Sequence, residues 1–191
     1  MKPRPARRVR IVAGERRGHR IAVSRVPGLR PTGEKVREAI FDVLGPVQDL
    51  FVVDLFAGTG AMGLEALSRG ARKCVFVEGD PTVAAMLQRN IMALGYESRG
   101  RVIASDYREA LPVLAHERDG FDLLFVDPPY RMLQEVEATL GPLLPRIMGD
   151  GGVVVVEGAR SFEVTFGYAP VFERTYGETR VTMIRIGRSV T

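Results

Sequence analysis

A carboxylate, two prolines and an aromatic ring stand side by side at Asp127-Pro128-Pro129-Tyr130. They follow the apolar run 121–126, which predicts a buried parallel strand. Neither proline has an N–H to donate to a sheet ladder, so the strand must end there, at the edge where open α/β sheets bind ligands. A carboxylate and a carbonyl can accept N–H bonds from a planar group with an exocyclic amine, and the ring can stack on its face. We therefore predict that Asp127, Pro128, Pro129 and Tyr130 form the catalytic site.

A glycine-rich segment runs from Asp54 to Gly63 and joins an expected strand to an expected helix. Gly58, Gly60 and Gly63 match the pattern G-x-G-x-x-G, and Glu78 lies 20 residues beyond Gly58. In dinucleotide-binding proteins such an acid holds the ribose hydroxyls. Taken literally, the pattern predicts a nicotinamide dinucleotide.

The charge at the end of the first strand favours a different cofactor. A carboxylate at Asp54 would repel a pyrophosphate drawn to the helix N-terminus, and it would attract a cationic ligand. S-adenosylmethionine carries a sulfonium and an ammonium and has no phosphate. Asp106, after the third expected strand, is placed either to receive the adenine amine or to cap the next helix. We predict S-adenosylmethionine as the cofactor, bound by Thr32, Asp54, Phe56, Ala57, Gly58, Thr59, Gly60, Glu78, Asp106 and Asp127.

The elements that would position these residues alternate between strands and helices from residue 50 onward. Expected strands are 50–55, 73–78, 101–105, 121–126 and 152–157; expected helices are 61–69, 107–115 and a segment that Asp80 caps and Gly95 closes. Segments 162–166 and 180–186 alternate like an antiparallel pair. Such an order predicts an α/β fold with a doubly wound, mostly parallel sheet and right-handed crossovers.

Positive charge is concentrated at the N-terminus. Residues 1–30 hold ten basic side chains and one acid, whereas the rest of the chain holds 17 basic and 22 acidic side chains. Segments 9–13 and 21–23 predict a hairpin around Gly14 to Gly18 that packs on the main domain or orders on a partner. We predict that this end binds RNA, through Arg7, Arg8, Arg10, Arg16, Arg17, His19, Arg20 and Arg30, with Lys35 and Arg37 on the following helix.

Composition excludes several classes of protein. The sequence has one cysteine, Cys74, so no internal disulfide can form. It has only two histidines in addition, so we do not expect a transition-metal site. No segment is long and apolar enough for a membrane span, so we expect no membrane and a cytoplasmic location. We expect the chain to divide into a basic hairpin extension over residues 1–29 and a catalytic domain over residues 30–191.

Together these motifs resemble the bacterial small-subunit ribosomal RNA guanine-N2 methyltransferases of the RsmD type. The resemblance rests on segment 54–70, on Asp127 to Tyr130, on segment 30–41, on 10–18, and on Tyr176-Gly177 followed by Thr179. It covers nearly the whole chain. The family pattern has an Asp-Arg pair where this chain has Glu34-Lys35, which keeps the charges.

The resemblance implies a class I methyltransferase fold, Rossmann-like, with seven strands, the last antiparallel, and an N-terminal β-hairpin extension. It implies S-adenosylmethionine as methyl donor and the N2 amine of one guanosine in 16S rRNA as acceptor. It also implies that the partner is the small ribosomal subunit or its assembly intermediate, not free RNA.

Other functions remain open on the sequence alone. An adenine-N6 DNA methyltransferase would use the same proline motif, but the chain has no room for a large target-recognition domain. A glutamine-N5 protein methyltransferase has Asn where this chain has Asp127, and cytosine-C5 chemistry would need a thiol other than Cys74. A noncatalytic RNA-binding assembly factor that retains a cofactor pocket, and a nicotinamide oxidoreductase, are the remaining alternatives.

Overall fold

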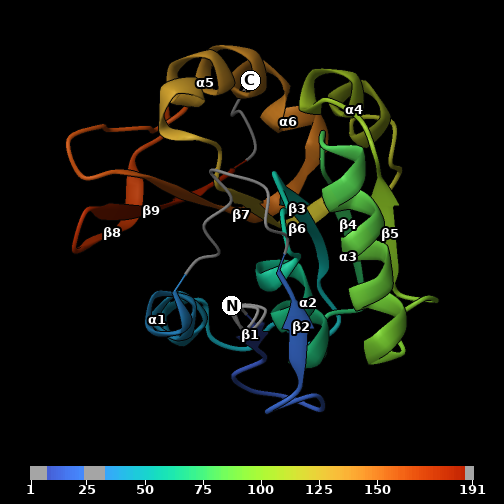
Figure 1. The fold of residues 1–191 in the computed structure, drawn as a ribbon. Coiled ribbons are helices and arrows are strands. Elements are labelled where there is room, and N and C mark those ends of the chain that lie inside the picture. The colour runs from blue at the N-terminus through green and yellow to red at the C-terminus, as the bar shows by residue number, and fades with distance from the viewer. Residues whose placement is uncertain (1–7, 24–32, 188–191) are drawn as a thin grey trace, which may run out of the picture.

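The computed structural model describes residues 8–23 and 33–187 (Figure 1). Its centre is a seven-stranded sheet with the strand order β5-β4-β3-β6-β7-β9-β8. All neighbouring pairs from β5 to β7 are parallel, whereas β9 runs antiparallel to both β7 and β8. The expected doubly wound sheet of the class I methyltransferase type, with an antiparallel last strand, is confirmed. The strands of the sheet are β3 (Phe51–Leu55), β4 (Lys73–Val77), β5 (Gly100–Ile103), β6 (Phe121–Val126), β7 (Met148–Ala159), β8 (Pro170–Tyr176) and β9 (Thr179–Arg185).

Helices cover both faces of this sheet and create two separate cores. One face carries α1 (Glu34–Leu44), α2 (Ala61–Ser68) and α3 (Pro81–Leu94), and the other carries α4 (Tyr107–Leu114), α5 (Leu133–Leu140) and α6 (Leu144–Ile147). The short 3₁₀ turns η1 (Tyr130–Met132) and η2 (Gly141–Leu143) flank α5. Because both faces are buried, the central strand β3 is apolar at every position except Asp54, which matches the pattern of a parallel sheet.

Local signals place most helix ends where the sequence predicts them. The Asp80 side chain accepts the N–H groups of Thr82 and Val83, Pro81 occupies the first helical position, and Gly95 ends α3 at a φ of 73°. These are the favoured solutions for the unpaired backbone groups at helix ends. Among the described residues, no helix is long and apolar enough to cross a membrane.

The expected strand at 162–166 is wrong. The partner of β9 in the hairpin is β8, over Pro170–Tyr176. Segment 162–166 instead lies against α5, where the Glu137 carboxylate accepts the N–H groups of Thr165 and Phe166 at 3.0 Å each. These bonds and the φ of 50° at Phe166 are incompatible with a continuous ladder.

The N-terminal hairpin, β1 (Arg8–Arg10) and β2 (Arg20–Ala22), packs on the main domain. Its apolar residues Val9, Ile11 and Ile21 are buried in the same core as α1, α2 and α3. Figure 1 shows the hairpin lying across the ends of α2 and α3. The described part of segment 1–29 therefore shares a core with the main domain, which explains how two three-residue strands remain ordered.

The fully buried Glu65 carboxylate on α2 holds this hairpin in place. It accepts the N–H groups of Val12 and Ala13 at 2.8 and 2.9 Å. It also forms ion pairs with Arg69 at 2.9 Å and with Arg37 at 3.4 Å, and Arg37 donates to the Arg10 carbonyl. A buried charge persists where several donors compensate its desolvation, so these contacts explain both the depth of Glu65 and the position of the hairpin.

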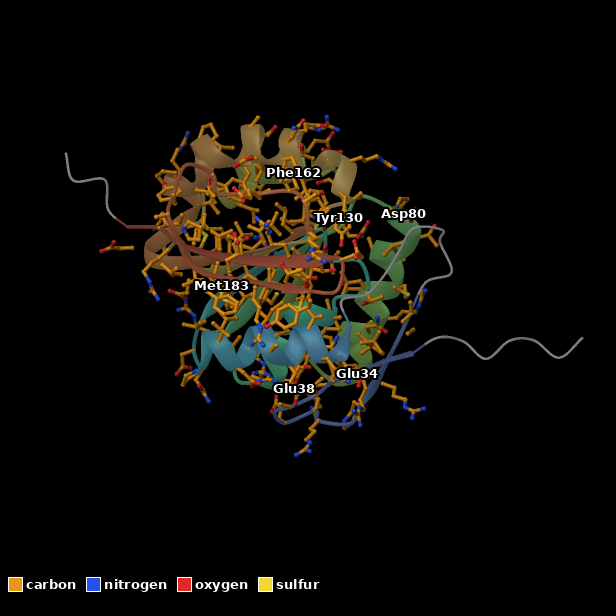
Figure 2. The ribbon with its side chains drawn as sticks, turned by 90° about the vertical axis from the view of Figure 1, so that its left-hand side faces the viewer. Glu34, Glu38, Asp80, Tyr130, Phe162 and Met183 are labelled. Atoms are coloured by element: carbon orange, nitrogen blue, oxygen red, sulfur yellow. The ribbon has the colours of Figure 1, made fainter. Side chains whose placement is uncertain are left out.

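We predict that Glu65→Gln lowers the free energy of unfolding by about 3–5 kcal/mol, because it leaves the fully buried Arg37 without a counter-charge. Urea unfolding measures this change. The control is Glu38→Gln on the exposed face of α1 (Figure 2), which should change stability by less than about 0.5 kcal/mol. Equal stabilities of the two variants would contradict a supporting role for Glu65.

Candidate active site

The carboxyl ends of three adjacent strands bring the predicted site residues together. In the sheet register, Leu55 of β3 pairs with Val77 of β4 on one side and with Val126 of β6 on the other. The residues that follow these three positions are Phe56, Glu78 and Asp127. Phe56 at the start of the glycine loop and Asp127 of the proline motif are 71 residues apart in the chain, and they meet at one edge of the sheet.

Glu78 fixes the glycine loop. One carboxylate oxygen accepts the Gly58 N–H at 2.8 Å, and the other accepts the Asp80 N–H at 2.8 Å. The side chain is half-buried. Glu78 thus joins the loop after β3 to the start of α3, and the predicted spacing between Gly58 and Glu78 is accounted for by a direct contact. Each oxygen keeps a lone pair for a ligand hydroxyl.

Protein packing accounts for two of the three glycines in the G-x-G-x-x-G pattern. A Cβ at Gly60 would lie 2.3 Å from Leu87 Cδ1, and a Cβ at Gly63 would lie 2.3 Å from Phe76 Cε1. The Gly60 N–H already donates to the Ala57 carbonyl at 2.7 Å. These glycines let α2 pack closely on α3 and β4, so the part of the pattern at Gly60 and Gly63 reflects helix packing.

Phe56 takes a strained backbone conformation at the start of this loop. Its φ of 69° lies in the left-handed region, which non-glycine residues rarely adopt and which occurs preferentially at functional sites. The Phe56 ring lies 5.0 Å from the ring of Tyr107 on α4, at an interplanar angle of 45°. The pair forms an apolar contact beside the glycine loop, and no sequence signal identifies Tyr107 as its partner.

Asp54 is the most perturbed carboxyl of the site. It is 4% exposed, and it accepts the Gly63 N–H at 2.9 Å. Burial, together with the negative charges of Asp127 and Glu78, raises the pKa of Asp54 to about 8, against the lowering effect of the Gly63 N–H bond. Three acidic groups thus interact electrostatically at this edge, and a positively charged ligand would relieve their repulsion. This arrangement fits a sulfonium and ammonium ligand and disfavours a pyrophosphate.

The catalytic motif turns sharply after β6. Asp127 is half-buried, Pro128 is buried, and Pro129 and Tyr130 are exposed. The Met132 N–H donates to the Pro129 carbonyl at 2.8 Å and closes the turn. Figure 2 shows Tyr130 and Asp80 on the same side of the molecule, as expected for residues that follow the carboxyl ends of β6 and β4. The strand therefore ends where the prolines predict.

The Tyr130 ring is held from a distant part of the chain. Its hydroxyl lies 3.1 Å from Oγ1 of Thr179, the first residue of β9, and forms a hydrogen bond with it. A ring that is 47% exposed would otherwise rotate freely. Thr179 is a site residue whose role the sequence did not reveal, although the segment Tyr176-Gly177 with Thr179 is part of the resemblance.

Asp106 acts as a helix cap in this structure. Its carboxylate accepts the Arg108 N–H at 2.9 Å and forms a two-pronged ion pair with the Arg108 guanidinium. These contacts with Arg108 lower the pKa of Asp106. Its predicted contact with an adenine amine stays a prediction.

Some of the side chains predicted to contact RNA are exposed, and others already interact with the rest of the protein. Arg17, His19, Arg20 and Lys35 are exposed. Arg10 is also exposed but pairs with Glu34 at 3.0 Å. Arg7 and Arg30 lie outside the described residues, as does the side chain of Arg8. Thr32, which is predicted to bind the cofactor, also lies outside them.

Two of the predicted RNA contacts are used by the fold. The prediction for Arg37 is wrong as the structure stands, because its side chain is 0% exposed and paired with Glu65. Arg16 is half-buried: its Nε donates to the Leu94 carbonyl at 2.8 Å, and its guanidinium lies 5.7 Å from the Tyr96 ring centroid. Both arginines fasten the hairpin and the first helix to the domain.

Asn90 is a buried side chain of the site that sequence reasoning missed. Its Oδ1 accepts the Ala22 N–H at 2.9 Å, and its Nδ2 donates to the carbonyls of Ala22 and Thr59 at 3.1 Å each. One amide therefore joins α3, the hairpin strand β2 and the glycine loop. The available signal was a polar residue on the apolar face of α3, between Leu87 and Leu94.

Comparison with known proteins gives a consistent set of relatives. Residues 9–185 match the family described as "Conserved hypothetical protein 95". A Bacillus subtilis protein named "Putative rRNA methyltransferase YlbH" is 33% identical over 182 residues, which cover 93% of this chain and 98% of that protein. The Escherichia coli "Ribosomal RNA small subunit methyltransferase D" is 42% identical over 124 residues, 64% of this chain and 61% of that protein. The solved structure of "Putative methyltransferase yhhF" from Escherichia coli superposes with a TM-score of 0.79 at 33% identity, covering 95% of this chain and 99% of that one.

We predict a pH-dependent stability that Asp54→Asn removes. Because the pKa of Asp54 is raised from 3.8 to about 8 on folding, the folded protein holds a proton at neutral pH that the unfolded chain releases. The free energy of unfolding therefore falls as the pH rises from about 4 to about 8, and this contribution levels off above the folded-state pKa. Urea unfolding of the ligand-free protein across this range checks the slope. Identical slopes for wild type and variant would contradict the raised pKa.

We further predict that Asn90→Ala lowers the free energy of unfolding by about 2–4 kcal/mol, because it leaves the buried Thr59 carbonyl and two part-buried backbone groups of Ala22 without their partner. The control is Gln88→Ala on the exposed face of the same helix, for which urea unfolding should show a loss below about 0.5 kcal/mol. If the two variants were equally stable, Asn90 would not join the hairpin to the loop.

Proposed function

This chain belongs to the family described as "Conserved hypothetical protein 95", the RsmD family, and on that premise we propose that it methylates ribosomal RNA with S-adenosylmethionine. The finer proposal is that the acceptor is the N2 amine of one guanosine in the 16S rRNA of the small ribosomal subunit or its assembly intermediate. One observation supports both the general and the finer proposal. Two groups of residues, one suited to a cation and one suited to an aromatic amine, lie at the same edge of the sheet. The acids Asp54 and Glu78 suit a cation, and Asp127 with Tyr130 suits an aromatic amine.

The cofactor fits the charge and the shape of the loop. When bound, S-adenosylmethionine supplies a methyl group activated by the positive sulfonium. Asp54 is one of the residues that would hold this cation, and a bound positive charge would favour loss of its proton. Glu78, already fixed by the N–H groups of Gly58 and Asp80, would accept the ribose hydroxyls with its remaining lone pairs.

The catalytic motif would orient the acceptor amine. The exocyclic nitrogen of guanine is a poor nucleophile, because its lone pair is delocalised into the ring. Asp127 and the Pro128 carbonyl would accept the two amine hydrogens and thereby aim the nitrogen at the methyl group. Correct alignment of this kind contributes up to about 7–11 kcal/mol to catalysis. After transfer the nitrogen is cationic and acidic, and Asp127 is the group placed to take its proton.

Tyr130 would hold the base itself. An extruded base needs a surface to replace the stacking that it loses, and stacking on an aromatic ring is worth roughly 1–3 kcal/mol. The hydrogen bond to Thr179 fixes the ring before the base arrives. A ring fixed in this way loses less conformational entropy on binding.

The exposed basic side chains of the hairpin and of α1 would contribute phosphate contacts, which give affinity without sequence specificity. Arg17, His19, Arg20 and Lys35 are described members of this set, and Arg10 is also exposed but pairs with Glu34. A ribosomal substrate would place the reaction in the bacterial cytoplasm.

The test is methyl transfer from labelled S-adenosylmethionine to small ribosomal subunits purified from cells that lack this gene. Naked 16S rRNA and duplex DNA serve as alternative acceptors, and the nucleosides are identified by mass spectrometry. We expect N2-methylguanosine from subunits. N6-methyladenine from DNA would overturn the proposed substrate, and binding of the cofactor without any transfer would favour a noncatalytic assembly factor.

Within this assay we predict that Asp127→Ala lowers kcat/KM by roughly 10²–10³-fold, because the amine loses its charged acceptor. Cofactor affinity, measured by calorimetry, should fall much less than kcat/KM, because Asp54 and Glu78 still face the cofactor. The matched control is Asp119→Ala, an exposed carboxylate in the loop before β6, which should keep full activity. An Asp127→Ala variant with most of its turnover would remove the proposed role.

A further inference from the structure

Two arginines next to the catalytic motif have no role in the fold. Arg131 directly follows Tyr130 in η1, and Arg160 directly follows the last residue of β7. Both side chains are exposed. Within 8–23 and 33–187, neither forms an ion pair with an acidic side chain. Two cations are thus available to a ligand at this point of the surface.

The backbone fixes Arg160 close to the Tyr130 ring, although the two are 30 residues apart. Ala159 pairs with Thr179 in the β7–β9 ladder, and the Arg160 N–H donates to the Glu178 carbonyl at 2.8 Å. Thr179 in turn bonds the Tyr130 hydroxyl at 3.1 Å. The start of β9 therefore connects the ring to Arg160, and Arg131 is the residue next to Tyr130 in the chain.

The basic hairpin does not serve this part of the surface. Its loop is bound to the last turns of α2 and α3, because Ser68 Oγ accepts the Arg16 N–H and Leu94 accepts the Arg16 side chain. Those helices begin at the carboxyl edge of the sheet and end away from it. The hairpin loop is therefore distant from Asp127 and Tyr130, and phosphates beside the catalytic motif need other cations.

An extruded nucleotide presents such phosphates. Turning a base out of its stack rotates the backbone on both of its sides, and side-chain contacts to the flanking phosphates hold that geometry. Arginine suits this task, because its planar guanidinium binds phosphate oxygens in pairs.

We propose that Arg131 and Arg160 bind the RNA phosphates on either side of the target nucleotide while its base stacks on Tyr130. This inference rests on the proposed function, since it assumes an RNA substrate. It adds two substrate-binding residues at the mouth of the site, separate from the hairpin.

Glu178, an acid next to Arg160, allows a test in which the expected change in KM has the opposite sign. Its side chain is exposed in the turn between β8 and β9, and only its carbonyl contacts Arg160. A carboxylate there repels an approaching phosphate, so Glu178→Gln should lower the KM for small ribosomal subunits.

The main test compares Arg131→Gln and Arg160→Gln with Arg146→Gln. Arg146 is a matched control, because it is exposed at the opposite end of β7, on α6. We expect each site variant to raise the KM for small ribosomal subunits about tenfold and to reduce the salt slope of RNA binding by about one. Calorimetric affinity for S-adenosylmethionine should stay the same in all three variants.

Two results are distinguished by this design. If wild-type protein methylates subunits and both site variants match Arg146→Gln in KM and salt slope, the inference is overturned and the proposed function stands. If wild-type protein transfers no methyl group, the proposed function fails. In that case the salt slope of binding to 16S rRNA by the same variants still decides whether Arg131 and Arg160 contact RNA.

Discussion

The carboxyl of Asp54 lies in the central strand of the sheet with almost no access to water, and the site is organised around the cost of that burial. One N–H, from Gly63, compensates it, while Glu78 and Asp127 add negative charge nearby. A carboxyl in this environment retains its proton at neutral pH unless a cation approaches. The sheet thus builds a place that favours a positively charged ligand, and it does so beside a strand end that presents an amine acceptor.

Glu65 is also buried, but its surroundings differ from those of Asp54. They suit a carboxylate that supports the fold, whereas those of Asp54 suit a carboxylate that binds a ligand. Two hairpin N–H groups and two guanidinium groups surround it, so its charge is compensated within the protein. Within residues 8–23 and 33–187, Asp54 accepts one N–H and is near two acidic groups, so its ionised form would need a cation from a ligand. Glu65, the buried acid that is fully paired, holds the hairpin. Asp54, the buried acid that is not fully paired, lies at the proposed ligand site.

The sequence predicted those elements whose ends depend on local chemistry. Asp80 with Pro81 and Gly95 defined α3, and the proline pair after Val126 defined the end of β6. The strand expected at 162–166 failed, because the Glu137 carboxylate, distant in sequence, binds that segment against α5. The prediction that Arg37 lies at the surface failed in a similar way. Helical spacing on α1 does not reveal that the Glu65 carboxylate on α2 pairs with Arg37.

The sequence by itself determined the fold class, the glycine loop after β3 and the end of β6 at the proline pair, because glycine and proline restrict the backbone locally and hydrophobic periodicity decides which faces are buried. Only the tertiary structure decided which polar side chains cooperate. Asn90 joins the hairpin to the glycine loop, Thr179 fixes Tyr130, and Arg160 reaches the mouth of the site through the β7–β9 ladder. These contacts link segments far apart in the chain, and their energies depend on burial and distance, which no short-range pattern contains.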